Sequence, residues 1–137
     1  MKILVCTDFS AGAAAGEREA ARRFPDAELI LFHAVDTRLA AVVADLTSSR
    51  REEMVKSMAR YADVRLNEVV QRLSAPGRRV VPELGEGNPV ELAMEAAQRH
   101  AVELIVLGVA SGVEVGRFRT RLVRRARVPV LIVPTEV

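Results

Sequence analysis

The sequence predicts an α/β protein built on a doubly wound, five-stranded parallel sheet. Five short apolar runs recur along the chain, and segments with helical features separate most of them. Strands that alternate with helices form βαβ crossovers, which make the strands parallel and cover both faces of the sheet. The runs are nearly continuous rather than alternating, as expected for strands that are buried on both faces.

The first strand and the first helix lie at the start of the chain. Lys2–Thr7 is a nearly continuous apolar run, in which Cys6, the one cysteine of the chain, is expected to pack as a small hydrophobe. A helix is predicted from Ala11 to Phe24, with Ser10 as its N-cap. Its alanine-rich side should face the sheet, and its charged residues, Glu17 among them, should face water.

The next segments are a strand, an ambiguous stretch and a long helix. Ala27–Val35 has the apolar character of a central parallel strand. Asp36–Arg51 is compatible with a short helix or with a loop over the carboxyl ends of the strands. Beyond it, a helix is predicted over Glu52–Leu73, because apolar residues recur there at spacings of four, four, three and four: Met58, Ala62, Leu66, Val69 and Leu73.

A third strand is predicted over Val80–Leu84, followed by a turn at Gly85–Asn88. Pro82 lies inside this strand and has no N–H group to donate to a neighbour. Proline is confined to edge strands for this reason, so the strand should lie at an edge of the sheet.

A further helix and two strands complete the pattern. Asn88 as N-cap and Pro89 at the first helical position predict a helix that ends near His100. Glu103–Val109 is the fourth strand, and Val128–Val133 is the fifth. A short arginine-rich helix separates these two strands.

Size and composition indicate one domain that spans residues 1–137 and is located in the cytoplasm. A chain of 137 residues has the usual length of a single domain. Its apolar runs are far shorter than the roughly 20 residues that a membrane span requires. Lys2 is followed by too few apolar residues for a secretory signal. A single cysteine forms no intramolecular disulfide, which fits a reducing compartment.

Positive charge is concentrated near the end of a chain whose net charge is only +2. Six arginines fall within eleven residues: Arg117, Arg119, Arg121, Arg124, Arg125 and Arg127. Such a run is most often a solvated helix face, and the alternative is a binding surface for phosphate or another anionic partner. With one tyrosine and no tryptophan, the chain lacks the stacking platforms of single-stranded nucleic-acid binders, so nucleic acid is not the favoured partner.

Right-handed crossovers predict the strand order 3-2-1-4-5, in which the winding reverses between the first and fourth strands. Ligands of open α/β sheets bind at this reversal, outside the carboxyl ends of the strands. The residues placed there are Thr7–Ser10 after the first strand and Gly108–Gly116 after the fourth.

Three stretches together resemble the universal stress protein family. They are LVCTDFS at residues 4–10, GNPVELAMEAAQRHAVELIVLG at 87–108 and RRARVPVLIV at 124–133. The resemblance spans nearly the whole chain. It implies a Rossmann-like fold of the adenine nucleotide alpha hydrolase type and a role in stress response.

Members of this family that bind ATP resemble one another in the loop after the fourth strand, and this chain departs from them. Their loop has a glycine, two residues, a second glycine, nine residues and then Gly-Ser or Gly-Thr, whose N–H and hydroxyl groups hold the phosphates. Here Gly108 matches the first glycine, Ser111 replaces the second, and Gly112 follows one position late. Gly116 matches the last glycine, and Arg117 occupies the hydroxyl position. The loop is about five residues shorter than the motif.

The resemblance also implies that Thr7, Asp8 and Val35 line the adenine and ribose part of a cleft. A purely structural alternative is that Asp8 caps the first turn of the following helix and that Thr7 ends the strand. ATP with Mg²⁺ is the cofactor that the resemblance suggests, and Arg117 is a candidate for supplying charge to a phosphate in place of the lost hydroxyl.

The leading hypothesis is a non-catalytic regulatory dimer with weak or lost binding of adenine nucleotide. In the family the last strand commonly pairs with its twin, and Val130, Leu131, Ile132 and Val133 would otherwise form an exposed apolar edge. One alternative is an ATP-binding member that hydrolyses ATP slowly. Against an enzyme, no Ser/His/Asp set is evident, because His33 lies in a strand and His100 at a helix end. The other alternative is an anionic partner bound by the helix at Arg117–Arg127.

Overall fold

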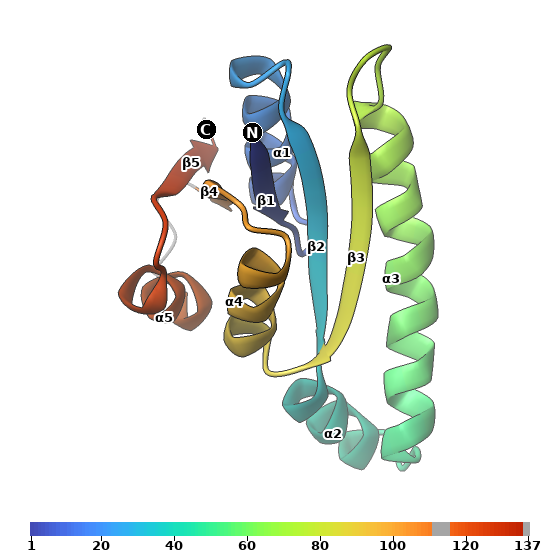
Figure 1. Cartoon of the computed structure of the whole chain (residues 1–137). Coiled ribbons are helices and arrows are strands. Elements are labelled where there is room, and N and C mark those ends of the chain that lie inside the picture. The colour runs from blue at the N-terminus through green and yellow to red at the C-terminus, as the bar shows by residue number, and fades with distance from the viewer. Residues whose placement is uncertain (111–115, 136–137) are drawn as a thin grey trace.

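A computed structural model describes residues 1–110 and 116–135, and its strands form one five-stranded sheet (Figure 1). The strands are β1 (Lys2–Cys6), β2 (Glu28–Asp36), β3 (Val80–Gly87), β4 (Leu104–Ala110) and β5 (Val130–Thr135). Their order is β3-β2-β1-β4-β5, and each neighbouring pair is parallel. The predicted doubly wound topology is therefore confirmed, and so is the edge position of the strand that contains Pro82.

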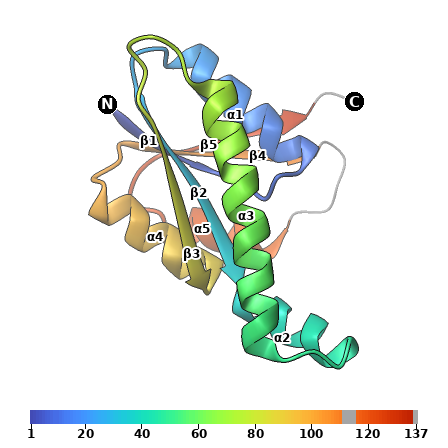
Figure 2. The same cartoon turned by 90° about the vertical axis from the view of Figure 1, so that its right-hand side faces the viewer.

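Helices cover both faces of the sheet. They are α1 (Ala11–Arg23), α2 (Thr37–Leu46), α3 (Arg51–Leu73), α4 (Pro89–Arg99) and α5 (Arg117–Arg125). Figures 1 and 2 show α1 and α3 on one face, and α4 and α5 on the other. None of the helices in the described part of the chain has the combination of length and apolar character that spanning a bilayer requires.

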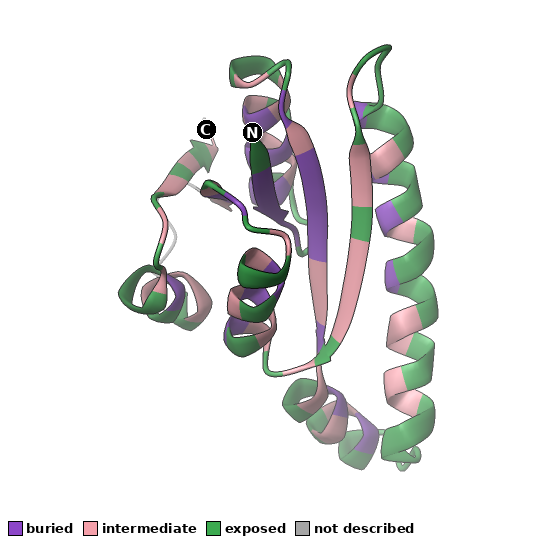
Figure 3. Ribbon diagram, in the orientation of Figure 1, coloured by how far each residue is buried: buried purple, intermediate pink, exposed green. Residues whose placement is uncertain are grey.

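The hydrophobic core consists of two clusters, one on each face of the sheet. Because side chains alternate along a strand, Ile3 and Val5 pack beneath α1 and α3, whereas Leu4 and Cys6 pack beneath α4 and α5. Figure 3 shows β2 buried along most of its length and the outer side of α3 exposed. Burial on both faces explains why the strands are nearly continuous apolar runs.

The predicted helix caps are present. Ser10 Oγ accepts a hydrogen bond from the N–H of Ala13 at 3.1 Å and begins α1. Asn88 Oδ1 accepts one from the N–H of Val90 at 3.0 Å, with Pro89 at the first position of α4. Each cap satisfies a backbone donor that has no partner within its own helix.

The ambiguous stretch contains a helix, α2, which begins directly after β2. Asp36 Oδ1 accepts hydrogen bonds from the N–H groups of Arg38 and Leu39, at 2.9 and 3.2 Å. Asp36 is thus both the last residue of β2 and the N-cap of α2. This places α2 at the carboxyl end of β2, as Figure 1 shows.

The predicted turn at Gly85–Asn88 was wrong for most of its length. β3 continues to Gly87, and Gly85 pairs with Ala34. A Cβ at Gly85 would lie 3.1 Å from Leu92 of α4, so the glycine lets the strand pass close beneath this helix. The last strand also begins later than predicted, at Val130, and extends to Thr135.

The prediction that Glu17 faces water was also wrong. Glu17 is only 1% exposed. It lies one turn after Ala13 and one turn before Ala20, and both alanines are buried. Residues at this spacing share one face of a helix, so Glu17 points inward with them.

Candidate functional site

The carboxyl ends of β1 and β4 border a cavity of about 750 Å³. Five of the eight residues predicted as nucleotide contacts line it: Thr7, Asp8, Val35, Gly108 and Gly116. The cavity lies where the winding of the sheet reverses, and its volume is in the range of small-molecule sites. The structure thus brings together residues that are up to 109 positions apart in the sequence.

Of the three other residues predicted as nucleotide contacts, the structure describes Arg117 alone. Arg117, at the first position of α5, is exposed and does not line the cavity, whereas Arg119 lines it and is half-buried. Successive residues of a helix differ by about 100° in direction, so residues two positions apart point to nearly opposite sides. Arg117 therefore points outward and Arg119 inward. Ser111 and Gly112 fall outside the described residues.

Much of the outer wall comes from residues that the sequence did not single out as ligand contacts. Leu39 of α2 and Met58 and Tyr61 of α3 line the cavity. α2 and α3 reach it because α2 begins at the carboxyl end of β2. The sequence held the relevant signal in Asp36, a good N-cap residue directly after a buried strand.

Thr7 is held by hydrogen bonds from several directions. Its N–H donates to the carbonyl of Phe32 at 2.9 Å, which continues the β1–β2 ladder. Its hydroxyl donates to Glu17 Oε2 at 2.6 Å and accepts from the N–H of Phe9 at 3.0 Å. The Thr7 hydroxyl is therefore engaged inside the protein and fixes the turn that follows β1.

His33 contacts the same residue through its ring. His33 Nδ1 lies 2.7 Å from the carbonyl oxygen of Thr7. A carbonyl oxygen only accepts hydrogen bonds, so Nδ1 carries the proton. In the neutral ring, Nε2 is then an acceptor, and His33 is one of the residues that line the cavity.

Asp8 does not cap the first turn of α1, because Ser10 is the N-cap of that helix; Asp8 stabilises the turn just before it and also lines the cavity. Its Oδ1 accepts a hydrogen bond from the N–H of Ser10 at 3.0 Å. Oδ2 accepts none from the described residues, and the side chain is exposed. One carboxylate oxygen thus stabilises the turn, while the other is available to a ligand hydroxyl.

Phe9 has a backbone conformation that is unusual for a residue with a side chain. Its φ is 65°, in the left-handed region, which costs about 1–2 kcal/mol. The hydrogen bond from its N–H to Thr7 Oγ1 supports this conformation. Its ring lies 4.6 Å from that of His33 and 6.4 Å from that of Tyr61, measured between centroids, and the guanidinium of Arg65 lies 5.4 Å from its centre. The strained turn therefore builds an aromatic wall.

Gly108 has a packing role that does not depend on any ligand. A Cβ at Gly108 would lie 1.8 Å from the carbonyl oxygen of Gly12, and a Cβ at Gly16 would lie 2.7 Å from the nitrogen of Gly108. The backbone of α1 therefore touches that of β4 directly, at the edge of the cavity. The contact by itself requires a glycine at position 108, whether or not the cavity holds a ligand.

Glu17 connects this end of the sheet to a second helix. While Oε2 accepts from Thr7, Oε1 accepts from Arg72 Nη2 of α3 at 2.7 Å. The carboxylate is almost fully buried, whereas the Arg72 side chain is 56% exposed. A buried carboxylate requires such partners, so this network ties β1, α1 and α3 together. Within the described residues, no three His, Cys, Asp or Glu side chains gather as metal ligands.

The chain matches the model of the universal stress protein family over residues 1–134. A parallel sheet of order 3-2-1-4-5 with a cavity at its winding reversal agrees with that assignment. The chain therefore belongs to the universal stress protein family. A comparison with curated protein sequences found no match.

Solved structures of the same family have the same fold. A universal stress protein family member from Burkholderia pseudomallei has a TM-score of 0.79 and 26% sequence identity, over 98% of this chain and 96% of that chain. A universal stress protein in complex with cAMP has a TM-score of 0.64 and 23% identity, over 99% and 98%. A family member from Arabidopsis thaliana with AMP bound has a TM-score of 0.70 and 14% identity, over 100% and 93%.

Proposed function

We propose that this chain is a non-catalytic, regulatory universal stress protein whose cavity binds an adenine nucleotide with a single phosphate group. The observation that carries the proposal is the cavity at the carboxyl ends of β1 and β4, whose lining includes both the carboxylate of Asp8 and the guanidinium of Arg119. A carboxylate that accepts from ribose hydroxyls and a guanidinium that binds phosphate are the polar groups that such a ligand needs.

The base has a suitable environment in this cavity. Val35, Leu39 and Met58 supply apolar surface, and Tyr61 and Phe9 add aromatic rings. Sites for planar ligands are lined mainly by such side chains, with a few polar groups that fix the orientation. The acceptor at His33 Nε2 is suited to the exocyclic amino group of adenine.

The phosphate end favours a short ligand. Arg119 and Gly116, the N-cap of α5, line the cavity there. The positive end of a helix dipole and a guanidinium both attract a phosphate. Because the sequence between Gly108 and Gly116 is about five residues shorter than the ATP-binding motif, it contains fewer backbone donors for a β- or γ-phosphate.

Two of the structural relatives support this ligand class. One was solved in complex with cAMP and another with AMP bound, and each carries a single phosphate. The competing hypothesis from the family resemblance is an ATP-binding member that uses Mg²⁺ and hydrolyses ATP slowly. It predicts tighter binding of ATP than of AMP, dependence on magnesium, and release of phosphate.

Calorimetric titration of the purified chain with AMP, cyclic AMP, adenosine and ATP, with and without magnesium, tests the proposal. Replacing Arg119 by Gln should weaken the affinity for AMP about 10-fold or more, since a hydrogen bond to a charged group contributes about 1.5–3 kcal/mol. The affinity for adenosine should not change, because adenosine has no phosphate. Arg117→Gln removes the same charge outside the cavity and is the matched control. Equal AMP affinity of the two variants would contradict the proposal. So would magnesium-dependent binding of ATP that is tighter than that of AMP, with release of phosphate.

We further propose that the regulatory form is a dimer in which β5 pairs with β5 of a second copy. β5 is the edge strand next to β4, and Ile132 is 37% exposed on it. Val130, Leu131 and Val133 are half-buried and pack against the core clusters. An apolar edge strand presents unpaired backbone groups that a twin strand satisfies.

Ile132→Lys is the appropriate test of this dimer, because its side chain is exposed while that of Leu131 contacts the core. Light scattering coupled to size-exclusion chromatography should show a dimer for the wild type and a monomer for this variant. Val64→Lys places the same charge on the exposed side of α3 and should remain dimeric. A dimer that survives Ile132→Lys unchanged would exclude this interface.

A further inference from the structure

Three arginines of α5 form a stripe on its outer side. Arg117, Arg121 and Arg124 follow one another at spacings of four and three residues, which places them on one face of the helix, and all three are exposed. The opposite side of the helix is apolar: Leu122 is fully buried, and Phe118 packs against the same core cluster. We call these three residues the arginine stripe.

The arginine stripe has no carboxylate partner among the described residues. Elsewhere in the chain many arginines form ion pairs with glutamate or aspartate: Arg22, Arg23, Arg51, Arg65, Arg72, Arg79 and Arg99. Acidic residues thus neutralise much of the positive charge elsewhere on the protein, whereas none of those that the structure describes pairs with the stripe. Unpaired guanidinium groups on one helix face attract polyanions.

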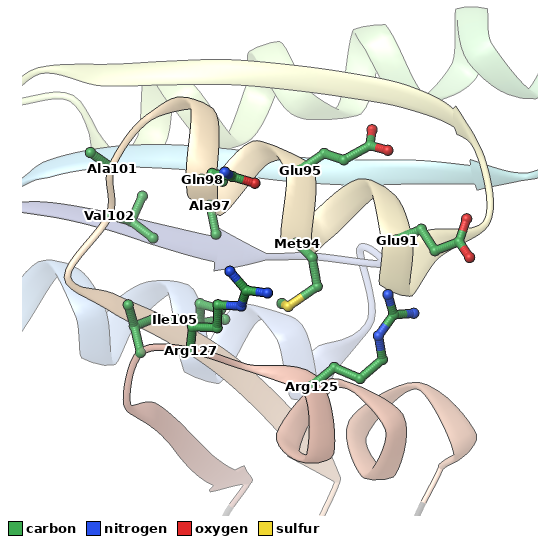
Figure 4. A pocket seen from close by; sticks show the side chains of 11 residues that line it. Glu91, Met94, Glu95, Ala97, Gln98, Ala101, Val102, Ile105, Arg125 and Arg127 are labelled. Carbon is green, nitrogen blue, oxygen red and sulfur yellow. The ribbon is translucent and has the colours of Figure 1, made fainter.

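The other arginines at this end of the chain have different surroundings. Arg125 and Arg127 line a hollow of about 660 Å³ between α4 and the chain around α5. Figure 4 shows both side chains extending toward α4, on which Glu91 and Glu95 also line the hollow. Arg119 lines the cavity described above. The stripe is therefore the part of this basic segment that lines neither the hollow nor the cavity, and no carboxylate of the described residues pairs with it.

We propose that the arginine stripe binds the phosphate backbone of double-stranded nucleic acid. The planar guanidinium group forms paired hydrogen bonds with phosphate oxygens, which an ammonium group does not. From Arg117 to Arg124 the helix rises about 10 Å at 1.5 Å per residue. One strand of a duplex carries a charge about every 3.4 Å along its axis, so this length matches about three phosphates.

The surroundings of the stripe favour a duplex over other polyanions. A helix that inserts into a membrane surface needs its apolar side free, but Leu122 of α5 is fully buried in the core. Val123 is the large apolar residue that α5 exposes, which is too little for the apolar anchors of a protein partner. Single strands are bound on stacked aromatic rings, and the exposed aromatic residue of the described surface, Tyr61, is on α3.

Duplex binding is separable from nucleotide binding. The stripe residues do not line the cavity, while Arg119 does. Substitution of the stripe should therefore leave AMP affinity unchanged, and Arg119→Gln should leave the duplex contact in place. The two proposals can fail independently.

Fluorescence anisotropy with a labelled DNA duplex of mixed sequence tests the inference on the full chain. Three phosphate contacts should weaken binding about 40-fold between about 50 and 200 mM salt, because each contact releases condensed counterions. Arg117→Gln/Arg121→Gln/Arg124→Gln should abolish most of this salt dependence and reduce affinity at low salt at least about 10-fold. All three side chains are exposed, so the melting temperature should change little.

The matched control is Arg38→Gln/Arg50→Gln/Arg60→Gln, which removes the same charge from exposed positions on or beside α2 and α3. It should bind the duplex nearly as the wild type does. Equal losses in the two triple variants would show a general charge effect and overturn the proposal. So would tighter binding of anionic lipid vesicles or of polyglutamate than of the duplex, since these represent a membrane and an acidic protein.

Discussion

The hydroxyl of Thr7 donates a hydrogen bond to the buried carboxylate of Glu17, at 2.6 Å. Thr7 directly follows the last residue of β1 and lines the cavity, and Glu17 lies in α1. Because Arg72 of α3 donates to the other oxygen of Glu17, one carboxylate fixes the position of two helices relative to the strand that borders the site.

Glu17→Ala should destabilise the protein by about 2–4 kcal/mol, because it leaves the buried Thr7 hydroxyl without its acceptor and opens space in the core. Glu17→Gln keeps one oxygen that accepts from Thr7, but its NH2 group faces the donor Arg72, so we expect a smaller loss than for alanine, about 1.5 kcal/mol. Urea unfolding followed by circular dichroism gives both values. If the two variants are equally stable, the Thr7–Glu17 hydrogen bond does not contribute as inferred.

Gly108→Ala should destabilise the fold by about 3 kcal/mol or more, or prevent soluble expression. The added Cβ would meet the backbone of Gly12 at 1.8 Å, where no side chain can rotate away. Gly116→Ser is the control, because a Cβ there meets nothing within 4 Å and serine is a good N-cap. It should stay within about 0.5 kcal/mol of the wild type. Similar stability of the two variants would refute the direct contact between α1 and β4.

Cys6 should be unreactive in the folded protein. Burial raises the pKa of its thiol from 9.0 to about 12. At pH 8 the reactive thiolate is then about one part in ten thousand. A disulfide reagent that colours on reaction should label one thiol per chain in guanidinium chloride and almost none under native conditions. Rapid labelling of the native protein would show that β1 is accessible to the reagent.

The stability of the protein should fall in acid partly through Glu83 of β3. Burial alone would raise the pKa of this carboxyl, but hydrogen bonds from Arg99 and His100 outweigh it, and the pKa lies below the ordinary 4.5. A lowered pKa contributes stability that is complete above about pH 4.5 and is lost as the pH falls through the shifted value. Glu83→Gln should therefore be less stable than the wild type at neutral pH, and the difference should shrink below about pH 4.5. A pH-independent difference would contradict this coupling.

The order of the strands was predictable because it depends on patterns that short segments carry by themselves. Each buried parallel strand is a continuous apolar run, and the right-handed crossover rule then leaves few arrangements. Pro82 predicted which strand lies at the edge of the sheet, since the missing N–H group is a property of the residue type and needs no knowledge of distant segments. The caps at Ser10 and Asn88 are equally local.

Features that depend on packing between distant segments were predicted less well. Glu17 was expected in water because charged residues usually are, and its partners Thr7 and Arg72 are 10 and 55 positions away. The sequence predicted Arg117 as the phosphate ligand, whereas Arg119 lines the cavity. Which arginine faces the cavity depends on the rotation of α5 about its axis, and the burial of Leu122 in the core sets that rotation. The extension of β3 to Gly87 depends on the fit of Gly85 beneath Leu92.

The position of α2 has a consequence for access to the cavity. Leu39, Val42 and Leu46 of α2 are all more than half exposed, and only Ala40 and Ala44 of this helix are buried. A helix with so little buried apolar surface unfolds locally at a lower free energy than the sheet does. Since Leu39 belongs to the cavity wall, we expect local unfolding of α2 to widen the cavity on that side while the strands stay folded. Amide hydrogen exchange in α2 measures how often this local unfolding occurs.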